Sequence, residues 1–248
     1  MRLALALLAT LLIPGAAAGA NGKQLYGRYC AMCHGPDGSG QVTPAAVGAG
    51  PARDQDVVGA VVPSLRGVGA QAAHFYLTTG YMPLKRPGIQ PRRSRLLLGP
   101  GQIDALIAYV ASLGNGPAIP RPHPGRGSLS EGQHLFAERC AGCHQIMAKG
   151  GYTTDAVPPP LQDATPVQIA EAVRIGPYVM PKFSRTAISE SQLDSIVRYV
   201  RWTRHPDNRG GASLGDVGPV PEGLVTWFVA GAALIALCML LGRRLRRG

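Results

Sequence analysis

The chain has 248 residues, enough for two small domains, and it is rich in glycine and proline but poor in aromatic residues. Its formal charge of +11 is as high as that of many nucleic-acid-binding proteins. However, four of these charges belong to arginines in residues 243–248 and one to Arg2, which leaves +6 on residues 21–242. We therefore expect no nucleic-acid partner. Four of the five cysteines fall in two short motifs, so no pair is left for a structural disulfide.

Residues 1–20 have the pattern of a secretory signal peptide. Arg2 supplies the positive start, an apolar stretch runs from Leu3 to Ile13, and Ala18-Gly-Ala20 is a small-residue cleavage site. The apolar stretch is too short to span a bilayer comfortably. An uncleaved N-terminal anchor is the alternative.

A cysteine motif follows a short helix that we expect over residues 22–29. The motif, Cys30-Ala-Met-Cys33-His34, is the C-x-x-C-H pattern by which c-type haem is attached. Two thiols within one turn can form thioethers to one porphyrin, and the histidine under the ring offers its imidazole to the iron. A redox dithiol, or a structural zinc site shared by two such pairs, is the alternative. Neither needs a histidine directly after the second cysteine, so the pattern favours haem.

The same motif recurs 110 positions later as Cys140-Ala-Gly-Cys143-His144. The offset also aligns the residues before each motif: Gly22, Leu25 and Tyr26 match Gly132, Leu135 and Phe136. The chain therefore contains an internal repeat, and we expect one covalently bound haem c in each copy. Small domains with few aromatic residues bury little apolar surface of their own, and a bound porphyrin would add to their hydrophobic core.

Each repeat is expected to close with a helix that is apolar on one side. Ser189 and Gln192 form a capping box at the start of the second closing helix. Apolar residues recur at i, i+3, i+4 and i+7, which is the spacing of one helical face. They are Ile103, Leu106, Ile107 and Val110 in the first repeat, and Leu193, Ile196, Val197 and Val200 in the second.

The first repeat has about twenty extra residues, which lie in Gly38–Val62 and Lys85–Gly99. The second stretch includes a basic loop, Lys85–Arg95, that is either a docking surface or a solvated loop. Its charged residues are Lys85, Arg86, Arg92, Arg93 and Arg95.

Two methionines are candidates for the second axial ligand of the iron. Met82 and Met180 each precede a proline between a motif and a closing helix, and proline favours an extended backbone that helps a loop present the thioether. The repeated Met-Pro context favours ligation over a role as core filler. Met147 follows His144 too closely, and His74 is a bis-histidine alternative in the first domain. His/Met ligation suits electron transfer, and no set of catalytic residues is expected.

Residues 223–242 are an uncharged apolar run that spans about 30 Å as a helix. Trp227 lies near one end and arginines follow the other, as at the two interfaces of a membrane. A buried core helix is the alternative, but the basic cluster argues against it. The positive-inside rule places the tail in the cytoplasm and the haem domains outside the plasma membrane. This sidedness holds whether residues 1–20 are cleaved, giving a single pass, or retained, giving a double pass.

The two repeats resemble class I cytochrome c domains. Each has an opening helix, the C-x-x-C-H motif, a Pro-Leu loop (Pro63-Ser-Leu65 and Pro159-Pro-Leu161), a Met-Pro loop and a closing helix. The resemblance implies that the first and last helices cross with aromatic residues near the crossing, and that the proline of the Pro-Leu loop backs the axial histidine. The expected ligands are Cys30, Cys33, Cys140 and Cys143 for the porphyrins, and His34 with Met82 and His144 with Met180 for the irons.

The expected fold is all-α, with two tandem class I cytochrome c domains and one C-terminal transmembrane helix. Its parts are a signal peptide or anchor (1–20), domain I (21–114), a Pro-rich linker (115–130), domain II (131–206), a stalk (207–222), the transmembrane helix (223–242) and a basic tail (243–248).

Tandem domains followed by a span that begins Gly218-Pro-Val-Pro-Glu-Gly-Leu-Val-Thr-Trp227 resemble the dihaem cytochrome c subunit of actinobacterial menaquinol–cytochrome c reductases. Residues 64–80 and 176–183 are similar too. The resemblance implies an electron-transfer subunit of an oxidoreductase, with a cytochrome b subunit and a Rieske iron–sulfur subunit as partners. Electrons would pass from the Rieske centre through the first and second haems to a haem-copper oxidase. The alternatives are a tethered dihaem carrier for a dehydrogenase or another terminal oxidase, and a haem enzyme or sensor with an open iron site.

Overall fold

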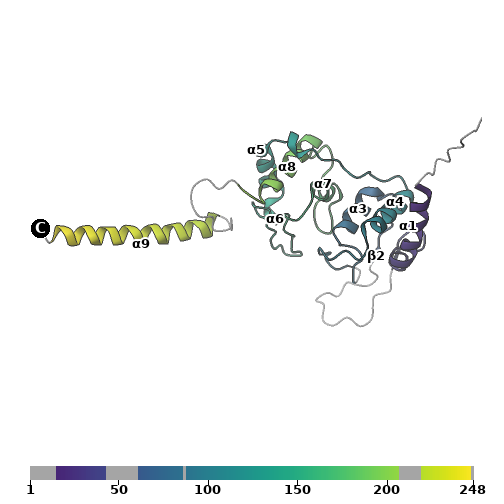
Figure 1. Ribbon diagram of the computed structural model, residues 1–248, viewed down its shortest axis with the longest axis horizontal. Helices are drawn as coiled ribbons and strands as arrows, with labels where there is room; N and C mark the ends of the chain where they lie inside the picture. The colour runs from purple at the N-terminus through teal and green to yellow at the C-terminus, as the bar shows by residue number, and fades with distance from the viewer. Residues whose placement is uncertain (1–14, 43–60, 86–87, 207–218, 247–248) are drawn as a thin grey trace, which may run out of the picture. The chain divides into compact units, whose positions relative to one another are not determined.

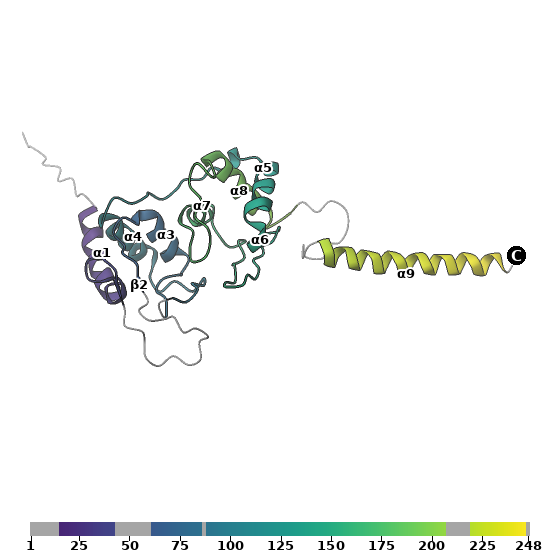
Figure 2. The same ribbon diagram turned by 180° about the vertical axis from the view of Figure 1, so that it is seen from behind.

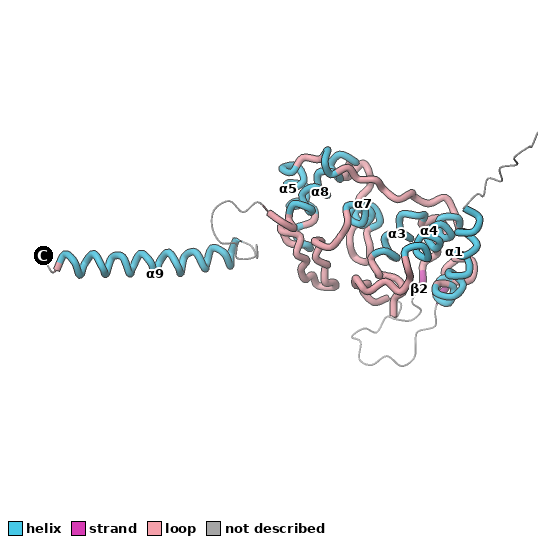
Figure 3. Tube along the Cα trace, in the orientation of Figure 1, coloured by secondary structure: helices cyan, strands magenta, loops and turns pink. Residues whose placement is uncertain are grey.

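The computed structural model describes residues 15–42, 61–85, 88–206 and 219–246 (Figure 1). Helices make up nearly all of its regular structure (Figure 3), which confirms the expected all-α class. Within the described residues there is one pair of two-residue strands, in which β1 (Gln41–Val42) lies antiparallel to β2 (Val61–Val62). Several predicted features lie outside the described residues: the start of the signal peptide, most of the Gly38–Val62 insertion, Arg86 of the basic loop and most of the stalk.

The chain divides into two compact units. Unit 1 comprises Met1–Arg121 with Val167–Ala187, and unit 2 comprises Pro122–Pro166 with Ile188–Gly248. Residues 167–187 therefore belong to the second repeat by sequence but pack with unit 1. The domain boundaries that follow from the repeat stay predictions.

Unit 1 is built on a crossing of its first and last expected helices, which lie side by side in Figures 1 and 2. Gly22 is buried at the crossing, where the helices are so close that a Cβ atom would overlap the carbonyl oxygen of Ala105. The rings of Tyr26 and Tyr109 meet beside it, with their centroids 5.1 Å apart. The first helix begins at Gly15, seven residues earlier than the sequence pattern predicts. The helices of this unit are α1 (Gly15–Tyr29), α2 (Ala31–His34), α3 (Gly69–Thr78), α4 (Pro100–Ser112) and α7 (Pro166–Ile175).

Unit 2 repeats the same crossing. Gly132 lies where a side chain would overlap the carbonyl oxygen of Ser195, and the rings of Phe136 and Tyr199 are 5.4 Å apart. Equivalent glycine and aromatic contacts in both units follow from the 110-residue repeat. The elements of this unit are the 3-10 turn η1 (Pro124–Arg126), α5 (Leu129–Arg139), α6 (Ala141–His144), α8 (Glu190–Trp202) and α9 (Pro219–Leu245).

The closing helix α8 has the predicted cap and the predicted buried face. Ser189 Oγ accepts from the backbone N–H of Gln192 at 3.2 Å, and Gln192 Oε1 accepts from the N–H of Ser189 at 2.9 Å. The four residues at helical spacing are almost completely buried: Leu193, Ile196, Val197 and Val200. Local capping and periodicity therefore determine where this helix starts and which side packs.

The C-terminal helix α9 is long and apolar enough to cross a membrane. The candidate span is Gly223–Leu245; its most apolar 18-residue window has a mean hydropathy of 2.5, and none of that window is buried against the rest of the described chain. Trp227 is 80% exposed. Its length, apolar composition and exposed surface support the expected C-terminal membrane anchor.

Candidate functional site

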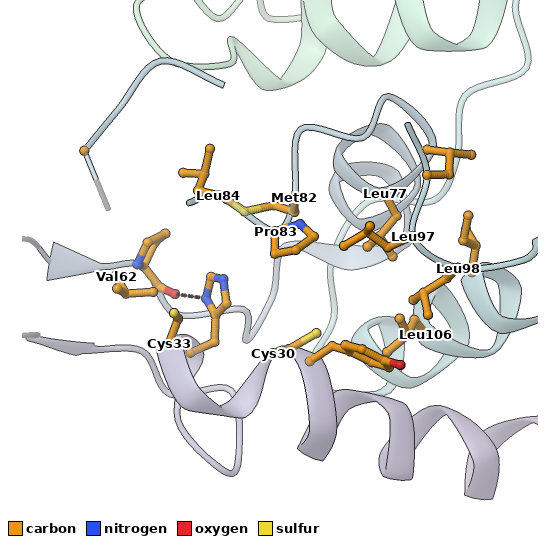
Figure 4. Close-up of a pocket in the computed structure, with 16 residues that line it drawn as sticks. Cys30, Cys33, Val62, Leu77, Met82, Pro83, Leu84, Leu97, Leu98 and Leu106 are labelled. Atoms are coloured by element: carbon orange, nitrogen blue, oxygen red, sulfur yellow. Dashed lines mark hydrogen bonds between the residues drawn. The ribbon is translucent and has the colours of Figure 1, made fainter. Parts of the chain in front are cut away.

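Unit 1 contains a cavity directly above the first cysteine motif (Figure 4). Its empty space, counted together with the open mouth, is about 990 Å³. The structure brings Cys30, Cys33, His34 and Met82 to the wall of this one cavity, although Met82 lies far from the motif in sequence. Cys30 and Cys33 come from the end of α1 and from α2, and Met82 comes from the loop after α3.

His34 has a fixed orientation in this cavity. Its Nδ1 lies 3.0 Å from the carbonyl oxygen of Pro63, the contact drawn as a dashed line in Figure 4. Because a carbonyl only accepts hydrogen bonds, Nδ1 carries the proton and the lone pair of Nε2 is left for a metal. Pro63 therefore backs the histidine through its carbonyl, as the resemblance implied for the Pro-Leu loop.

The other walls of the cavity are apolar. Leu77 of α3, Ile103 and Leu106 of α4, and the stretch Leu96–Leu98 contribute to them. Leu97 is 71% exposed although it lines the cavity, so it presents apolar surface that a bound porphyrin would cover. Two thiols, an oriented imidazole, a thioether and apolar walls fit haem c.

The thiols do not have the chemistry of a redox dithiol. Burial, with a smaller effect of Cys33, raises the pKa of Cys30 to about 11, and burial raises the pKa of Cys140 to about 11. A reactive C-x-x-C pair needs the opposite shift, toward the thiolate. A structural zinc site needs four converging ligands, and within the described ranges no three His, Cys, Asp or Glu side chains gather in this way.

The second motif has the same local geometry within unit 2. His144 Nδ1 lies 3.0 Å from the carbonyl oxygen of Pro159, and the hydroxyl of Tyr199 donates to the carbonyl of Ile146 at 2.8 Å. The equivalent bond in unit 1 joins the hydroxyl of Tyr26 to the carbonyl of Gly35 at 2.6 Å. Burial lowers the pKa of His144, although the bond to Pro159 opposes this shift. A neutral imidazole with its Nδ1 proton held by a carbonyl is the form that binds iron.

Two family models match consecutive parts of the chain. The model described as cytochrome c covers residues 19–114, and the model described as cytochrome c oxidase, cbb3-type, subunit III covers residues 127–200. The cytochrome bc1 complex cytochrome c subunit of Mycobacterium tuberculosis is 35% identical over 232 residues, which cover 90% of this chain and 77% of the relative. The subunit of the same name from Corynebacterium diphtheriae is 32% identical over 241 residues, covering 90% and 80%. This chain belongs to the family of cytochrome bc1 complex cytochrome c subunits.

More limited likenesses lie outside this family. The cbb3-type cytochrome c oxidase subunit CcoP of Rhodobacter capsulatus is 34% identical over 119 residues, which cover 42% of this chain and 37% of the relative. A reducing HAO-like protein complex from Kuenenia stuttgartiensis covers 74% of this chain and 95% of its own, at 14% identity and a TM-score of 0.35, too low to bear on the fold.

For a cytochrome bc1 complex cytochrome c subunit, the two domain matches imply covalently bound haem c and electron transport. The resemblance stated from the motifs is thus confirmed at the level of the family.

Met180 is the candidate ligand that the structure does not bring to its motif within one unit. It lies in the segment after α7 that packs with unit 1, where its backbone N–H donates to the carbonyl of Pro177 at 3.0 Å. His144 belongs to unit 2. Pairing of Met180 with His144 therefore stays a prediction, as does the axial role of Met82.

Sequence reasoning gave His74 only one minor role and gave Glu171 none. His74 of α3 is joined to Glu171 of α7 by a bond of 2.8 Å between Nδ1 and Oε1. The two residues are 97 positions apart, and neither lies in a recognisable motif. The sequence does contain one signal for this pair: Glu171 is an acidic residue between the buried apolar residues Ala170 and Val173 of α7.

Proposed function

We propose that this chain is the membrane-anchored dihaem subunit of a quinol–cytochrome c reductase, relaying electrons from a Rieske iron–sulfur subunit to a haem-copper terminal oxidase. The observation that carries this proposal is the repeated motif geometry in a chain of this family. In both units the histidine of C-x-x-C-H donates from Nδ1 to a carbonyl of the Pro-Leu loop at 3.0 Å. Because both motifs orient their histidine in the same way, we expect each motif to bind one haem.

The residues divide into two roles. Two cysteines per unit hold the porphyrin covalently, and they are Cys30 and Cys33 in the first unit and Cys140 and Cys143 in the second. His34 with Met82, and His144 with Met180, are proposed as the axial ligands. Haem c with this ligation exchanges one electron without bond making and has a raised reduction potential. The apolar walls around Leu77 and Leu106 exclude water from the first site.

The partners and sidedness follow from the family and from α9. The relatives are named as cytochrome c subunits of cytochrome bc1 complexes, which supports a cytochrome b subunit and a Rieske subunit as neighbours. Arg243, Arg244, Arg246 and Arg247 end the chain after the apolar run. By the positive-inside rule they stay in the cytoplasm, and the haem domains face the opposite side of the plasma membrane.

A second candidate function is a tethered dihaem carrier that serves a dehydrogenase or another terminal oxidase. The likeness of residues 127–200 to a cbb3-type oxidase subunit favours it, because that subunit belongs to an oxidase. Such a carrier would have no cytochrome b partner.

Gentle detergent extraction with a tag on this chain distinguishes the two functions. Co-purification of b-type haem and an iron–sulfur protein in fixed ratio is expected for the reductase subunit, and copper-containing oxidase alongside supports the terminal acceptor. Two c-type haems without any b-type haem would refute the reductase assignment and favour the carrier.

A further inference from the structure

The bond between His74 and Glu171 places a carboxyl group in an unusual environment. The Glu171 side chain is completely buried, and among the described residues its Oε2 atom has no hydrogen-bond partner. His74 Nδ1 lies 2.8 Å from Oε1, and the His74 side chain remains 24% exposed. Figures 1 and 2 show the two helices that carry the pair, α3 and α7, side by side. A buried carboxyl with one unsatisfied oxygen is costly when charged.

No strong cation offsets that cost. Within the described part of the chain, Glu171 pairs with His74, and burial is what shifts the pKa of its carboxyl. Arg93, from the basic loop, donates to Gln168 Oε1 at 3.0 Å, and Gln168 Nε2 in turn donates to Thr78 Oγ1 at 3.1 Å. Arg174 on the next turn of α7 donates to the carbonyls of Phe183 and Ser184. The nearby positive charges are therefore held by other partners.

These surroundings set the protonation of the pair. Burial raises the pKa of Glu171 to about 8. Burial also lowers the pKa of His74, against an opposing effect of Asp104 on α4. At neutral pH the pair is therefore net neutral, with the proton on the carboxyl of Glu171 and a neutral imidazole at His74. Above the pKa of the pair one proton is lost, and a negative charge stays in the interior.

The pair lies close to the first haem site. Leu77, which lines the cavity, follows His74 on α3 by three residues, or about 4.5 Å along the helix axis. A positive charge on the iron disfavours a proton on a nearby neutral pair. In general, a unit charge about 12 Å away changes a proton affinity roughly tenfold at an effective dielectric constant of about 20, and this sets the scale of the expected effect.

We propose that His74 and Glu171 form a proton-binding site that is linked to the redox state of the first haem. When the iron gains an electron from its donor, the deprotonated pair takes up one proton from solvent through the exposed edge of His74. When the iron loses that electron to its acceptor, the proton returns to solvent. The proposal rests on the proposed function only in requiring haem at the first motif.

The first test uses the wild-type protein. Spectra first establish that c-type haem is bound; its absence would refute the proposed function and with it a proton site linked to the first haem. With haem present, the reduction potential of the first haem is expected to fall as pH rises through about 8, by about 59 mV in total for a tenfold difference in proton affinity. A potential that is the same from pH 6 to pH 10 overturns the proposal without any variant.

A variant assigns the effect to the carboxyl, because haem propionates also titrate. Glu171→Gln keeps the size and removes the proton, so its first-haem potential should lose this pH dependence. The matched control is Glu138→Gln, which alters a His–Glu pair of similar length (3.1 Å to His134) whose side chains are 50% and 73% exposed. The control should keep the wild-type dependence.

Redox-difference infrared spectroscopy gives an independent readout. Around pH 8 the wild-type protein should show a carboxylic-acid band that appears on reduction, and Glu171→Gln should lack it. The band should persist in Glu138→Gln. Persistence of the band and of the pH dependence in Glu171→Gln would overturn the assignment.

Discussion

The helix crossings make a sharp prediction for a one-methyl change. Gly22→Ala places a Cβ atom 2.9 Å from Cβ of Tyr109 and even closer to the Ala105 carbonyl oxygen, whereas 3.4 Å is the lower bound of ordinary contact. The limiting contact is with the backbone carbonyl of Ala105 on α4, so the two helices must separate by roughly 1 Å or more. Overpacking of this kind costs about 1–3 kcal/mol, from which up to ~1 kcal/mol of gained helix propensity is subtracted.

Gly27→Ala is the matched control on the same helix. A Cβ at Gly27 meets no other atom within 4 Å, so the substitution should stabilise the protein by up to about 1 kcal/mol. The two variants should therefore differ by about 1–3 kcal/mol, or roughly 4–20 °C in the unfolding of unit 1. Thermal unfolding followed by the haem absorption of purified protein measures this difference. Equal midpoints for the two variants would refute close packing at the crossing of α1 and α4.

Three further predictions concern the ligands, pH and a helix cap. Met82→Ala and Met180→Ala should each abolish one sulfur-to-iron charge-transfer band in the oxidised spectrum, and survival of both bands in both variants would exclude these ligands. In the folded chain the pair keeps one proton up to about pH 8, because burial raises the pKa of Glu171 to that value and lowers the pKa of His74. The unfolded chain keeps that proton on His74 only up to its ordinary pKa of 6.5, so stability should decline as pH rises from about 6.5 to 8, by about 2 kcal/mol. Urea unfolding at pH 5 and 9 should show this decline in wild type and its loss in Glu171→Gln. Ser189→Ala should cost about 1 kcal/mol in the same assay, and an unchanged midpoint would remove the role of the cap.

Features encoded by neighbouring residues were predictable from the sequence. The face of α8 follows from apolar periodicity, and its start follows from the reciprocal bonds of Ser189 and Gln192. The haem motif is equally local, because both thiols and the histidine lie within five consecutive residues. Such patterns need no knowledge of the fold, which is why they were found without it.

Features that depend on distant segments were not predictable. Nothing near residues 167–187 indicates that they pack with unit 1, because that choice depends on the surface of α3. The pair of His74 with Glu171 joins positions 97 residues apart and has no spacing rule. The start of α1 at Gly15 was missed for another reason: the alanine-rich stretch before Asn21 favours helix but was assigned to the signal peptide. In contrast, the backing of His34 by Pro63 was expected from the family resemblance.

The central claim is that one chain carries two covalently bound haems. The intact mass of the chain, isolated from its native membrane under denaturing conditions, tests this claim most directly. We predict the mass of the mature polypeptide plus two haems, falling by one haem when Cys140 and Cys143 are both replaced by alanine. A wild-type denatured mass equal to that of the polypeptide with one haem, or with none, would contradict the account.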